Sequence, residues 1–384
     1  MVSISSVAIV GGVRTPFGKA GRAYAACHPA ELLAATYRGA LASAGVEPAT
    51  VDRILVGCVN QCGEQSYNVG RIAWLAANLT ETVPALTLDA QCCSGQEAVN
   101  LGAAMIMCGQ ADIVVAGGVE AASRVSPDSM WLGDSPVPPS LAARTELPHQ
   151  SQASERMARK YGITRDAADA FGVQSHLRAA QAWKSGAFDA EIVRVNGTDG
   201  PLLMRDEGIR ADSTPAAAAG LKPAYEADGI VTAANASQLS DGAACVILAS
   251  GEACTRHGLQ PLAWIRSMTS VGAEPQVMFE GPMHATQRLL DRMRLGIDDF
   301  DLFEVHEAYA IPVLAWMDAY GVPHEKVNVH GGAISLGHPF GASGARQILH
   351  LARQLAVRPG KRGLQLMCGG GGLGVGSIIE SALR

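Results

Sequence analysis

Charged and aromatic residues are scarce in this 384-residue chain. Only 17% of the residues are Asp, Glu, Lys or Arg and 5% are aromatic, whereas 48% are hydrophobic. This balance suits a large core with a modest exposed surface, as in an α/β body or an oligomer. The formal charge of −6 offers no basic surface for nucleic acid. No apolar run reaches the roughly 18 residues of a membrane-spanning helix, so neither a nucleic-acid partner nor a membrane partner is expected.

The nine cysteines lack the regular framework of a small disulfide-bonded protein. Residues 1–13 lack the basic segment of a secretion signal and are expected to form a strand. The cysteines are therefore expected to be reduced thiols in a cytoplasmic protein. Cys58 and Cys62 have the spacing of metal ligands, but no second pair completes a zinc site. No metal site is predicted.

Short apolar runs that end in glycine alternate with segments whose apolar residues recur every three or four positions. This alternation predicts a mainly parallel sheet with helices on both faces. The expected strands are Val7–Val10, Ile54–Val56, Val83–Leu88, Ile113–Ala116, Ala263–Ile265, Leu302–Val305, Leu364–Met367 and Gly374–Ile379. The expected helices are Pro29–Ala44, Gly95–Cys108, Ala285–Met293 and Gly344–Leu355.

A middle section of different composition separates two α/β halves. We place the first half at residues 1–120, the middle section at 121–250 and the second half at 251–384. The middle section has loops rich in Ser, Pro and Asp and one long helix, with Thr164 as its expected N-cap. A loop lobe inserted on a rigid scaffold commonly binds substrate.

Cys92 and Cys93 follow an apolar strand and precede a long helical pattern. Free backbone N–H groups and the helix dipole at such a turn favour a thiolate. A buried pair of cysteines that packs like small hydrophobic residues fits the same pattern. The segment by itself does not decide between a nucleophile and a core residue.

Two histidines stand where an α/β sheet places its functional groups. His306 follows the strand Leu302–Val305 directly, at the carboxyl end where ligands bind, although a histidine taken alone at such a place is more often structural. His338 lies among five glycines between Gly331 and Gly344. So many glycines indicate a backbone packed closely against a neighbour, which favours a functional histidine.

Cys368 is followed by four glycines, Gly369 to Gly372. The segment matches the pattern Gly-x-Gly-x-x-Gly, but a strand rather than a helix follows it, so a dinucleotide site is rejected. A cysteine at a strand end, next to glycine N–H groups that can bind an oxyanion, is the better interpretation.

Four segments together resemble the signatures of the thiolase family, in the family's order. They are Gln91-Cys92-Cys93-Ser94-Gly95, His306-Glu307-Ala308-Tyr309-Ala310, Gly337-His338-Pro339-Phe340-Gly341-Ala342-Ser343-Gly344 and Cys368-Gly369-Gly370-Gly371-Gly372. Arg14–Gly18, Gly117–Glu120 and Asn235–Ala243 match as well, so the resemblance runs from about residue 5 to the C-terminus. It implies two similar βαβαβαββ halves that form a layered α-β-α-β-α body with an inserted loop lobe.

The resemblance implies an acyltransferase that cleaves a 3-ketoacyl-CoA, or forms it in reverse by Claisen condensation. Cys92 would attack the 3-keto carbon after His338 accepts its proton. Cys368 would protonate the acetyl-CoA enolate, whose oxygen His338 and His306 hold. Backbone N–H groups of Cys92 and Gly370 would hold the tetrahedral intermediate. Cys93 stands where the family has glycine or alanine and is interpreted as a packing residue.

Coenzyme A is implied as a substrate, and no bound cofactor is expected. Arg210 matches a family arginine near the adenine, although taken alone it is equally a solvated surface charge. Ser237 matches a serine near the pantetheine, and His149 and Tyr309 belong to the substrate-binding segments. The family also implies a homodimer or homotetramer.

Departures from the family pattern concern the acyl chain. His149-Gln150-Ser151 stands where many acetoacetyl-type thiolases have His-Met-Gly, so the methionine that narrows their acyl pocket is absent. His306 replaces asparagine and Tyr309 replaces phenylalanine. We expect a degradative thiolase for a medium, branched or ring-bearing chain. The alternatives are a biosynthetic acetoacetyl-CoA thiolase, a decarboxylating ketoacyl synthase, against which Cys368 argues, and a non-catalytic acyl-CoA-binding protein.

Overall fold

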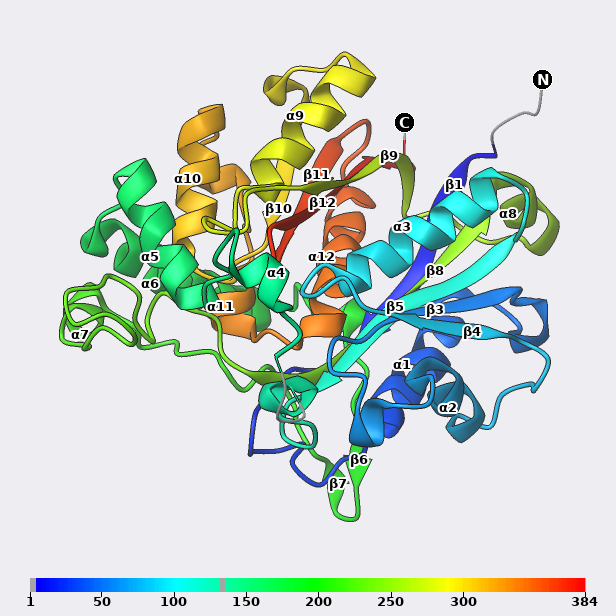
Figure 1. The fold of residues 1–384 in the computed structure, drawn as a ribbon. Coiled ribbons are helices and arrows are strands. Elements are labelled where there is room, and N and C mark those ends of the chain that lie inside the picture. Colours follow the sequence, from blue (N-terminus) through cyan, green and yellow to red (C-terminus); the bar gives the residue numbers. More distant parts are fainter. Residues whose placement is uncertain (1–4, 132–134, 384) are drawn as a thin grey trace.

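A computed structural model describes residues 5–131 and 135–383 (Figure 1). The ends of the two expected halves, residues 1–4 and 384, and residues 132–134 of the expected lobe lie outside the described residues. One mixed sheet has the order β10-β11-β12-β9-β1-β8-β5-β3-β4, and β2 pairs with β8. Its strands are β1 (Val7–Arg14), β2 (Gly18–Lys19), β3 (Arg53–Gly57), β4 (Ala85–Leu88), β5 (Ile113–Ala121), β8 (Ser240–Ser250), β9 (Ala263–Gly272), β10 (Leu302–Val305), β11 (Arg362–Gly369) and β12 (Leu373–Ser381).

Helices cover both faces of this sheet. The helices of the described residues, those of the lobe included, are α1 (Pro29–Ala44), α2 (Val69–Ala76), α3 (Ser94–Met107), α4 (Pro139–Ala142), α5 (Gln150–Tyr161), α6 (Arg165–Lys184), α7 (Pro215–Ala219), α8 (Gly251–His257), α9 (Gly281–Met293), α10 (Ala310–Tyr320), α11 (Ala333–Leu336) and α12 (Phe340–Leu355). Within the described residues, none of these helices is long and apolar enough to span a membrane.

Successive side chains of a strand pack against different helices, which explains why helices form layers on both faces of the sheet. Ala8 and Val10 pack with α1 and α2, whereas Val7 and Ile9 pack with α3 and α12, because successive side chains of a strand point to opposite faces. Helices α3 and α12 contact β5 and β8 of the first half and also β12 of the second half. They therefore form a middle layer between the two parts of the sheet.

The first half follows the order β1-α1-β3-α2-β4-α3-β5-β8 once the lobe between β5 and β8 is set aside. The second half runs β9-α9-β10-α10-α12-β11-β12, and an isolated bridge between Phe303 and Val327 stands in place of its third strand. The expected strands and helices are therefore present, and the helix at residues 29–44 has the predicted bounds.

The prediction of a mainly parallel sheet is wrong. Only the pairs β3–β4, β3–β5 and β10–β11 are parallel. The remaining pairs between sheet strands, such as β1–β8, β5–β8 and β11–β12, are antiparallel. Three residues, 370–372, join β11 to β12, and a parallel pair needs a crossover of a dozen or more residues.

The lobe ends earlier than the sequence suggested. Residues 240–250, assigned to the lobe, form β8, a wholly buried strand between β1 and β5. The lobe helices α5, α6 and α7 gather at one side of the molecule, where α5 and α6 pack against α10 (Figure 1). Thr164 caps α6 as expected, since its hydroxyl oxygen accepts a hydrogen bond from the N–H of Ala167 at 3.2 Å.

A buried ion-pair network ties the lobe to the sheet. Arg14, at the end of β1, binds Glu191 at 2.7 Å and Asp206 at 2.6 Å, and all three side chains are fully buried. The two carboxylates supply the countercharge that a buried guanidinium requires. The loops around residues 191 and 206 are thereby fixed beside the sheet end.

Backbone packs directly against backbone where α3 and α12 begin, and we call this the glycine contact of Gly95, Gly341 and Gly344. A Cβ on Gly95 would lie 2.3 Å from the carbonyl oxygen of Gly341, and one on Gly344 would lie 2.5 Å from the backbone nitrogen of Gln96. No side chain fits at these positions. The residues just before the two helices, which include Cys92 and His338, are therefore brought to the same region.

Candidate active site

Cys92 lies in a strained turn between β4 and α3. The preceding residue, Gln91, has a left-handed backbone with φ of 53°, which is uncommon for a residue other than glycine. The Ser94 hydroxyl closes the turn: its oxygen accepts from the N–H of Ala90 at 2.8 Å and its proton goes to the carbonyl of Gln91 at 2.6 Å. The turn places Cys92 beside the first turn of α3.

Burial controls the charge state of the Cys92 thiol. Desolvation raises its pKa to about 12, and the buried carboxylate of Glu120 acts in the same direction. The backbone N–H groups of Gly370 and of Cys92 itself lower the pKa but do not outweigh burial. The N–H groups at this turn thus favour a thiolate as expected, but burial has the larger effect on the pKa. The thiol is protonated and needs a base when it attacks.

The hydrogen bonds of His338 define its tautomer. Its Nδ1 lies 2.7 Å from the hydroxyl oxygen of Ser343, and that hydroxyl donates its proton to the carbonyl of Pro339 at 2.9 Å. Because a hydroxyl has one proton, Nδ1 of His338 must be the donor to Ser343. Nε2 of His338 then carries the free lone pair, as a general base requires.

His306 adds a second neutral imidazole. Its Nε2 lies 3.2 Å from Nε2 of His338, and both side chains are buried. Burial lowers the pKa of His338 to about 3 and holds the pKa of His306 well below its usual range, and the Arg346 guanidinium acts in the same direction. The two Nε2 atoms form one site that can accept a proton or bind an oxygen atom.

Cys368 is the last residue but one of β11, and its side chain is buried. Burial and the neighbouring Cys92 raise the pKa of Cys368, so it is a protonated thiol. Burial raises the pKa of the Tyr309 phenol, and Tyr225 and the thiols of Cys92 and Cys368 act in the same direction. The structure therefore gathers Cys92, Cys368, Gly370 and Tyr309, while the glycine contact holds the histidine pair at the neighbouring helix end.

The other buried cysteines nearby lie in apolar packing. Cys93 is fully buried in a small cluster with Met367 and Val375, and its burial raises the pKa of its thiol. Cys245 lies on β8 with its sulfur 3.2 Å from the Thr36 hydroxyl of α1, on the sheet face away from α3. Of these buried thiols, Cys92 is the one that meets two backbone N–H groups.

Glu120 is a site residue whose role the sequence did not reveal. Its carboxylate accepts hydrogen bonds from the backbone N–H groups of Val59, Asn60 and Gly341 at 3.0 to 3.1 Å, and from the Gln65 amide at 2.7 Å. It thus joins the end of β5 to the start of α12. In the sequence, the only indication that Glu120 belongs to the site was its place in the matched segment Gly117–Glu120. Its hydrogen-bond partners could not be predicted, because they lie far away in the chain.

Family models for the N-terminal and the C-terminal domain of thiolase match residues 7–252 and 259–381. The chain belongs to the thiolase family. The thiolase fold predicted from the sequence is thereby confirmed. Thiolases cleave or form 3-ketoacyl thioesters of coenzyme A, so the protein is an acyltransferase, as predicted.

Similar proteins and structures cover almost the whole chain. It is 41% identical to steroid 3-ketoacyl-CoA thiolase FadA6 of Mycobacterium tuberculosis, over 97% of this chain and 93% of the relative. It is 41% identical to an acetyl-CoA acetyltransferase of Cupriavidus necator, over 98% and 100%. The crystal structure of human mitochondrial 3-ketoacyl-CoA thiolase in complex with CoA has a TM-score of 0.90 at 32% identity, covering 100% of this chain and 99% of that one.

The backbone segment 233–239 connects the neighbourhood of a basic pocket on the lobe with His338, and we call this segment the track. The pocket, about 910 Å³ in volume, lies along α6 and includes Lys184, Arg205 and Arg210. Arg210 donates to the carbonyl of Ala233 at 3.4 Å. From there the chain runs past Ser237, whose N–H donates to Ala308 at 2.9 Å, to Leu239, which bridges His338.

His149 lies at the exposed rim of the thiolase site. It caps α5, and its ring centroid lies 5.5 Å from that of Tyr225, the residue whose phenol adjoins Tyr309. Gln150, the next residue, reaches Gly370: its Nε2 lies 3.5 Å from the position that a Cβ on Gly370 would take. The segment 149–150 thus borders the Cys92 thiol from the lobe side.

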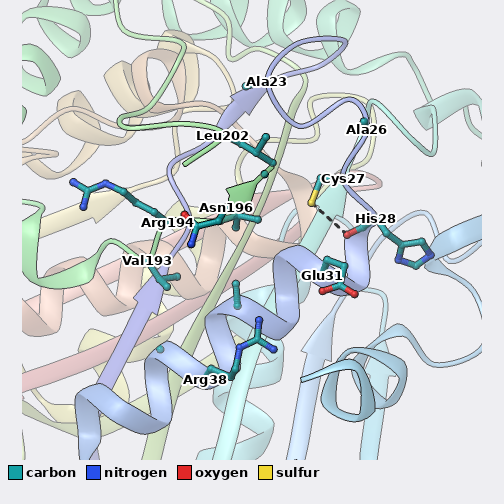
Figure 2. A pocket seen from close by; sticks show the side chains of 14 residues that line it. Ala23, Ala26, Cys27, His28, Glu31, Arg38, Val193, Arg194, Asn196 and Leu202 are labelled. Atoms are coloured by element: carbon teal, nitrogen blue, oxygen red, sulfur yellow. Dashed lines mark hydrogen bonds between the residues drawn. The ribbon is translucent and has the colours of Figure 1, made fainter. Parts of the chain in front are cut away.

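A second hollow lies apart from these residues. Figure 2 shows it between α1, which carries Glu31 and Arg38, and the segment of Arg194 and Asn196. Its volume is about 760 Å³, and it includes none of the candidate catalytic residues. In the described part of the chain, no group of three or more His, Cys, Asp or Glu side chains could hold a metal ion, and Cys58 and Cys62 belong to no such group.

Burial of the histidine pair predicts a loss of stability in acid. The folded-state pKa of His338, about 3, lies below the ordinary value of 6.5, so the unfolded chain binds more protons than the folded chain at pH values between these two. The stability contributed by a neutral His338 is complete above pH 6.5 and is lost as the pH falls toward 3. Each such histidine changes the free energy of unfolding by about 1.4 kcal/mol per pH unit.

Urea unfolding at pH 7, 6 and 5 measures this effect. We expect the free energy of unfolding of His306→Asn to fall less steeply below pH 6.5 than that of the unmodified protein, because one neutral histidine is gone. The buried carboxylates, whose raised pKa values act in the opposite direction, are present in both proteins and cancel in the comparison. Parallel pH dependences would contradict the assignment.

Proposed function

We propose that Cys92 is the thiolase nucleophile and that His338 is its base. The observations that carry this proposal are the two backbone N–H groups, of Cys92 and Gly370, that act on the Cys92 thiol, and the glycine contact that brings the start of α3 against the start of α12, which His338 precedes by two residues. The Cys92 proton passes to Nε2 of His338 as the sulfur bonds to C3 of the 3-ketoacyl-CoA. The two N–H groups then stabilise the oxyanion at C3.

The C2–C3 bond breaks next, and its electron pair forms the enolate of acetyl-CoA. Nε2 of His338, which now carries the thiol proton, and Nε2 of His306, 3.2 Å away, bind the enolate oxygen when both donate an N–H hydrogen bond to it. Cys368 is a protonated thiol at rest and gives its proton to C2, which releases acetyl-CoA. The Cys368 thiolate then takes the proton of the incoming CoA thiol, and the CoA sulfur displaces Cys92 from the shortened acyl group.

Coenzyme A follows the track from the basic pocket to His338 in this proposal. Lys184, Arg205 and Arg210 supply cations for its phosphates. Leu239 lies six positions after Ala233, so the two are at most about 20 Å apart when the segment is extended. The pantetheine arm of coenzyme A, which carries the thiol, lies along this segment and passes Ser237. His149 and Tyr309 lie at the end of the arm, where the acyl chain begins.

The acyl chain is longer than acetoacetyl, branched or ring-bearing, and the physiological direction is degradation. Gln150 supports this assignment, because it stands where acetoacetyl-type thiolases carry the methionine that narrows the pocket. The relatives named for steroid 3-ketoacyl-CoA and for β-ketoadipyl-CoA, 41% and 40% identical, act on such chains by their names. The equally similar acetyl-CoA acetyltransferase keeps a biosynthetic acetoacetyl-CoA thiolase as the second candidate.

A homodimer or homotetramer in the cytoplasm, with a role in lipid or fatty-acid breakdown, completes the proposal. Strand β4 ends the sheet order, and Leu86 at its centre is 40% exposed. An open strand edge with an exposed apolar residue is the kind of surface that a second copy covers. The cytoplasmic location rests on the nine cysteines, all free among the described residues.

Thiolysis of a panel of substrates tests the function. The protein is incubated with CoA and either acetoacetyl-CoA or longer, branched and ring-bearing 3-ketoacyl-CoA esters, and loss of the 3-keto thioester is followed. We expect a higher kcat/KM for the larger chains and an acyl adduct on the Cys92 peptide by mass spectrometry. A preference for acetoacetyl-CoA would support the biosynthetic alternative. No turnover and no adduct would leave a non-catalytic acyl-CoA-binding protein.

A further inference from the structure

The contact between the two histidines fixes the tautomer of His306. Nδ1 of His338 carries a proton, because the Ser343 hydroxyl can only accept there, so Nε2 of His338 has a lone pair. Nε2 of His306 lies 3.2 Å from that atom and must therefore donate. Burial, together with His338 and the Arg346 guanidinium, holds the pKa of His306 well below its usual range, so its ring is neutral. Its one proton is on Nε2, and its Nδ1 has a lone pair.

This Nδ1 atom of His306 needs a donor. The side chain is fully buried, and Nδ1 forms no hydrogen bond with any other residue that the structure describes. The partner of one ring nitrogen normally decides which nitrogen of a functional histidine carries the proton. Without a donor at Nδ1, that side of the ring does not favour either tautomer, and a proton on Nδ1 would remove the N–H from Nε2.

Strand β10 and helix α12 pass one another in opposite directions beside this ring. His306, just after the strand, contacts His338, which precedes the helix by two residues. Glu304, two residues earlier on the same face of the strand, contacts Arg346 at 3.3 Å and Gln354 at 3.5 Å, farther along the helix. Arg346 is midway in the chain between His338 and Gln354. It therefore lies beside the stretch of strand between Glu304 and His306.

The Arg346 side chain has an unused donor at this place. The residue is only 1% exposed, and its Nη1 donates to Oε2 of Glu304. Its Nε–H forms no hydrogen bond with another residue of the described chain. A buried donor and the buried Nδ1 acceptor of His306 thus lie at the same strand end without touching. A single water molecule is the usual link between two such groups in a protein interior.

Resting on the proposed thiolase function, we propose that Arg346 is a positioning residue that keeps the proton of His306 on Nε2. Its Nε–H donates to one buried water, and that water donates to Nδ1 of His306. Once the Cys92 proton has passed to His338, both histidines then offer an Nε2–H to the enolate oxygen. Asparagine at position 306 would donate through its amide group, which has no tautomers, and would not need the arginine.

A double-mutant cycle separates this role from a structural one. Arg346→Met removes the guanidinium, and we expect kcat for thiolysis to fall about 10- to 100-fold, as for the loss of one hydrogen bond from a charged group. KM should change little. In His306→Asn the same substitution should lower kcat by no more than about threefold. Equal losses in the two backgrounds would mean that Arg346 only holds β10 against α12, and would overturn the proposal.

Two further variants support the cycle. Arg346→Lys keeps a cation for Glu304 but has no Nε–H, so it should show the same dependence on residue 306 even if Arg346→Met does not fold. Arg353→Met is the matched control. Arg353 is a half-buried arginine of the same helix that donates to the carbonyl of Gly12 at 2.8 Å. Its replacement should have the same effect on kcat in both backgrounds.

The tautomer itself is read by nitrogen-15 NMR of the histidine rings, with the His306 signals identified by their loss in His306→Asn. We expect a protonated Nε2 and an unprotonated Nδ1 in the unmodified protein, and a population with the proton on Nδ1 in Arg346→Met and Arg346→Lys. A proton on Nδ1 in the unmodified protein, or an unchanged tautomer in both variants, would contradict the role of Arg346. Because the measurement needs no turnover, the expected spectra from a protein without thiolase activity would refute the proposed function alone.

Discussion

Replacing Cys92 by serine is expected to lower kcat/KM for thiolysis by about 10⁴- to 10⁶-fold, the range seen when a catalytic nucleophile is removed. The thiol already has a pKa of about 12 in its buried turn, and a hydroxyl is harder still to deprotonate. Its base, His338, has a pKa of about 3 and takes a proton only as the new bond forms. The assay is thiolysis of a 3-ketoacyl-CoA with CoA, together with mass spectrometry of the residue 92 peptide.

Cys93→Ala is the matched control for this substitution. Cys93 adjoins the nucleophile but packs in an apolar cluster, so its loss leaves the two N–H groups at Cys92 in place. We expect activity within about tenfold of the unmodified protein and an acyl adduct that still forms on Cys92. Substantial turnover by Cys92→Ser, or an adduct that moves to Cys93, would contradict the assigned nucleophile.

His338→Ala is expected to lower kcat by about 10⁴-fold. A general base contributes about 10²- to 10⁴-fold to the rate, and a lost oxyanion donor adds about 3 kcal/mol to the barrier. In the proposed mechanism His338 provides both, because its Nε2 would receive the thiol proton and lies 3.2 Å from Nε2 of His306. Single-turnover kinetics separate the steps: acyl transfer to Cys92 should become slow while binding of the ketoacyl-CoA is little changed.

Two milder variants give a graded comparison. Ser343→Ala removes the acceptor that fixes Nδ1–H of His338, so we expect a loss of about 10- to 100-fold in kcat with little change in KM. His306→Asn introduces the residue more frequent in the family and retains a donor, so it should lose less than His338→Ala. An active His338→Ala, or a Ser343→Ala that affects only KM, would contradict these roles.

Local patterns in the sequence predict most of the helices and strands. Helix α1 and strand β10 have the predicted bounds, Pro29–Ala44 and Leu302–Val305, since apolar spacing and the flanking turn residues are local properties. Strand direction is not local. Nothing within residues 240–250 indicates that β8 lies antiparallel between β1 and β5, because that depends on the path of the whole lobe.

The four candidate catalytic residues could be found from the sequence because each lies in a short motif. The pKa of Cys92 could not, since it depends on burial and on Glu120, which approaches from β5. The partners of Glu120, Val59 and Gly341, lie about 60 and 220 residues away from it. The contact of Ser343 with His338 could have been predicted from the sequence, because Ser343 lies five residues after His338 in the same motif.

The glycine contact makes activity depend on the docking of two pieces of chain. Cys92 lies in the segment matched to the N-terminal thiolase domain, whereas His306, His338 and Cys368 lie in the C-terminal one. The backbones of α3 and α12, which begin two residues after Cys92 and two residues after His338, touch at this contact. Neither half alone holds all four candidate catalytic residues. The rate of turnover therefore depends on how the two halves are aligned. A small separation of the two halves, too small to unfold either of them, would therefore abolish activity.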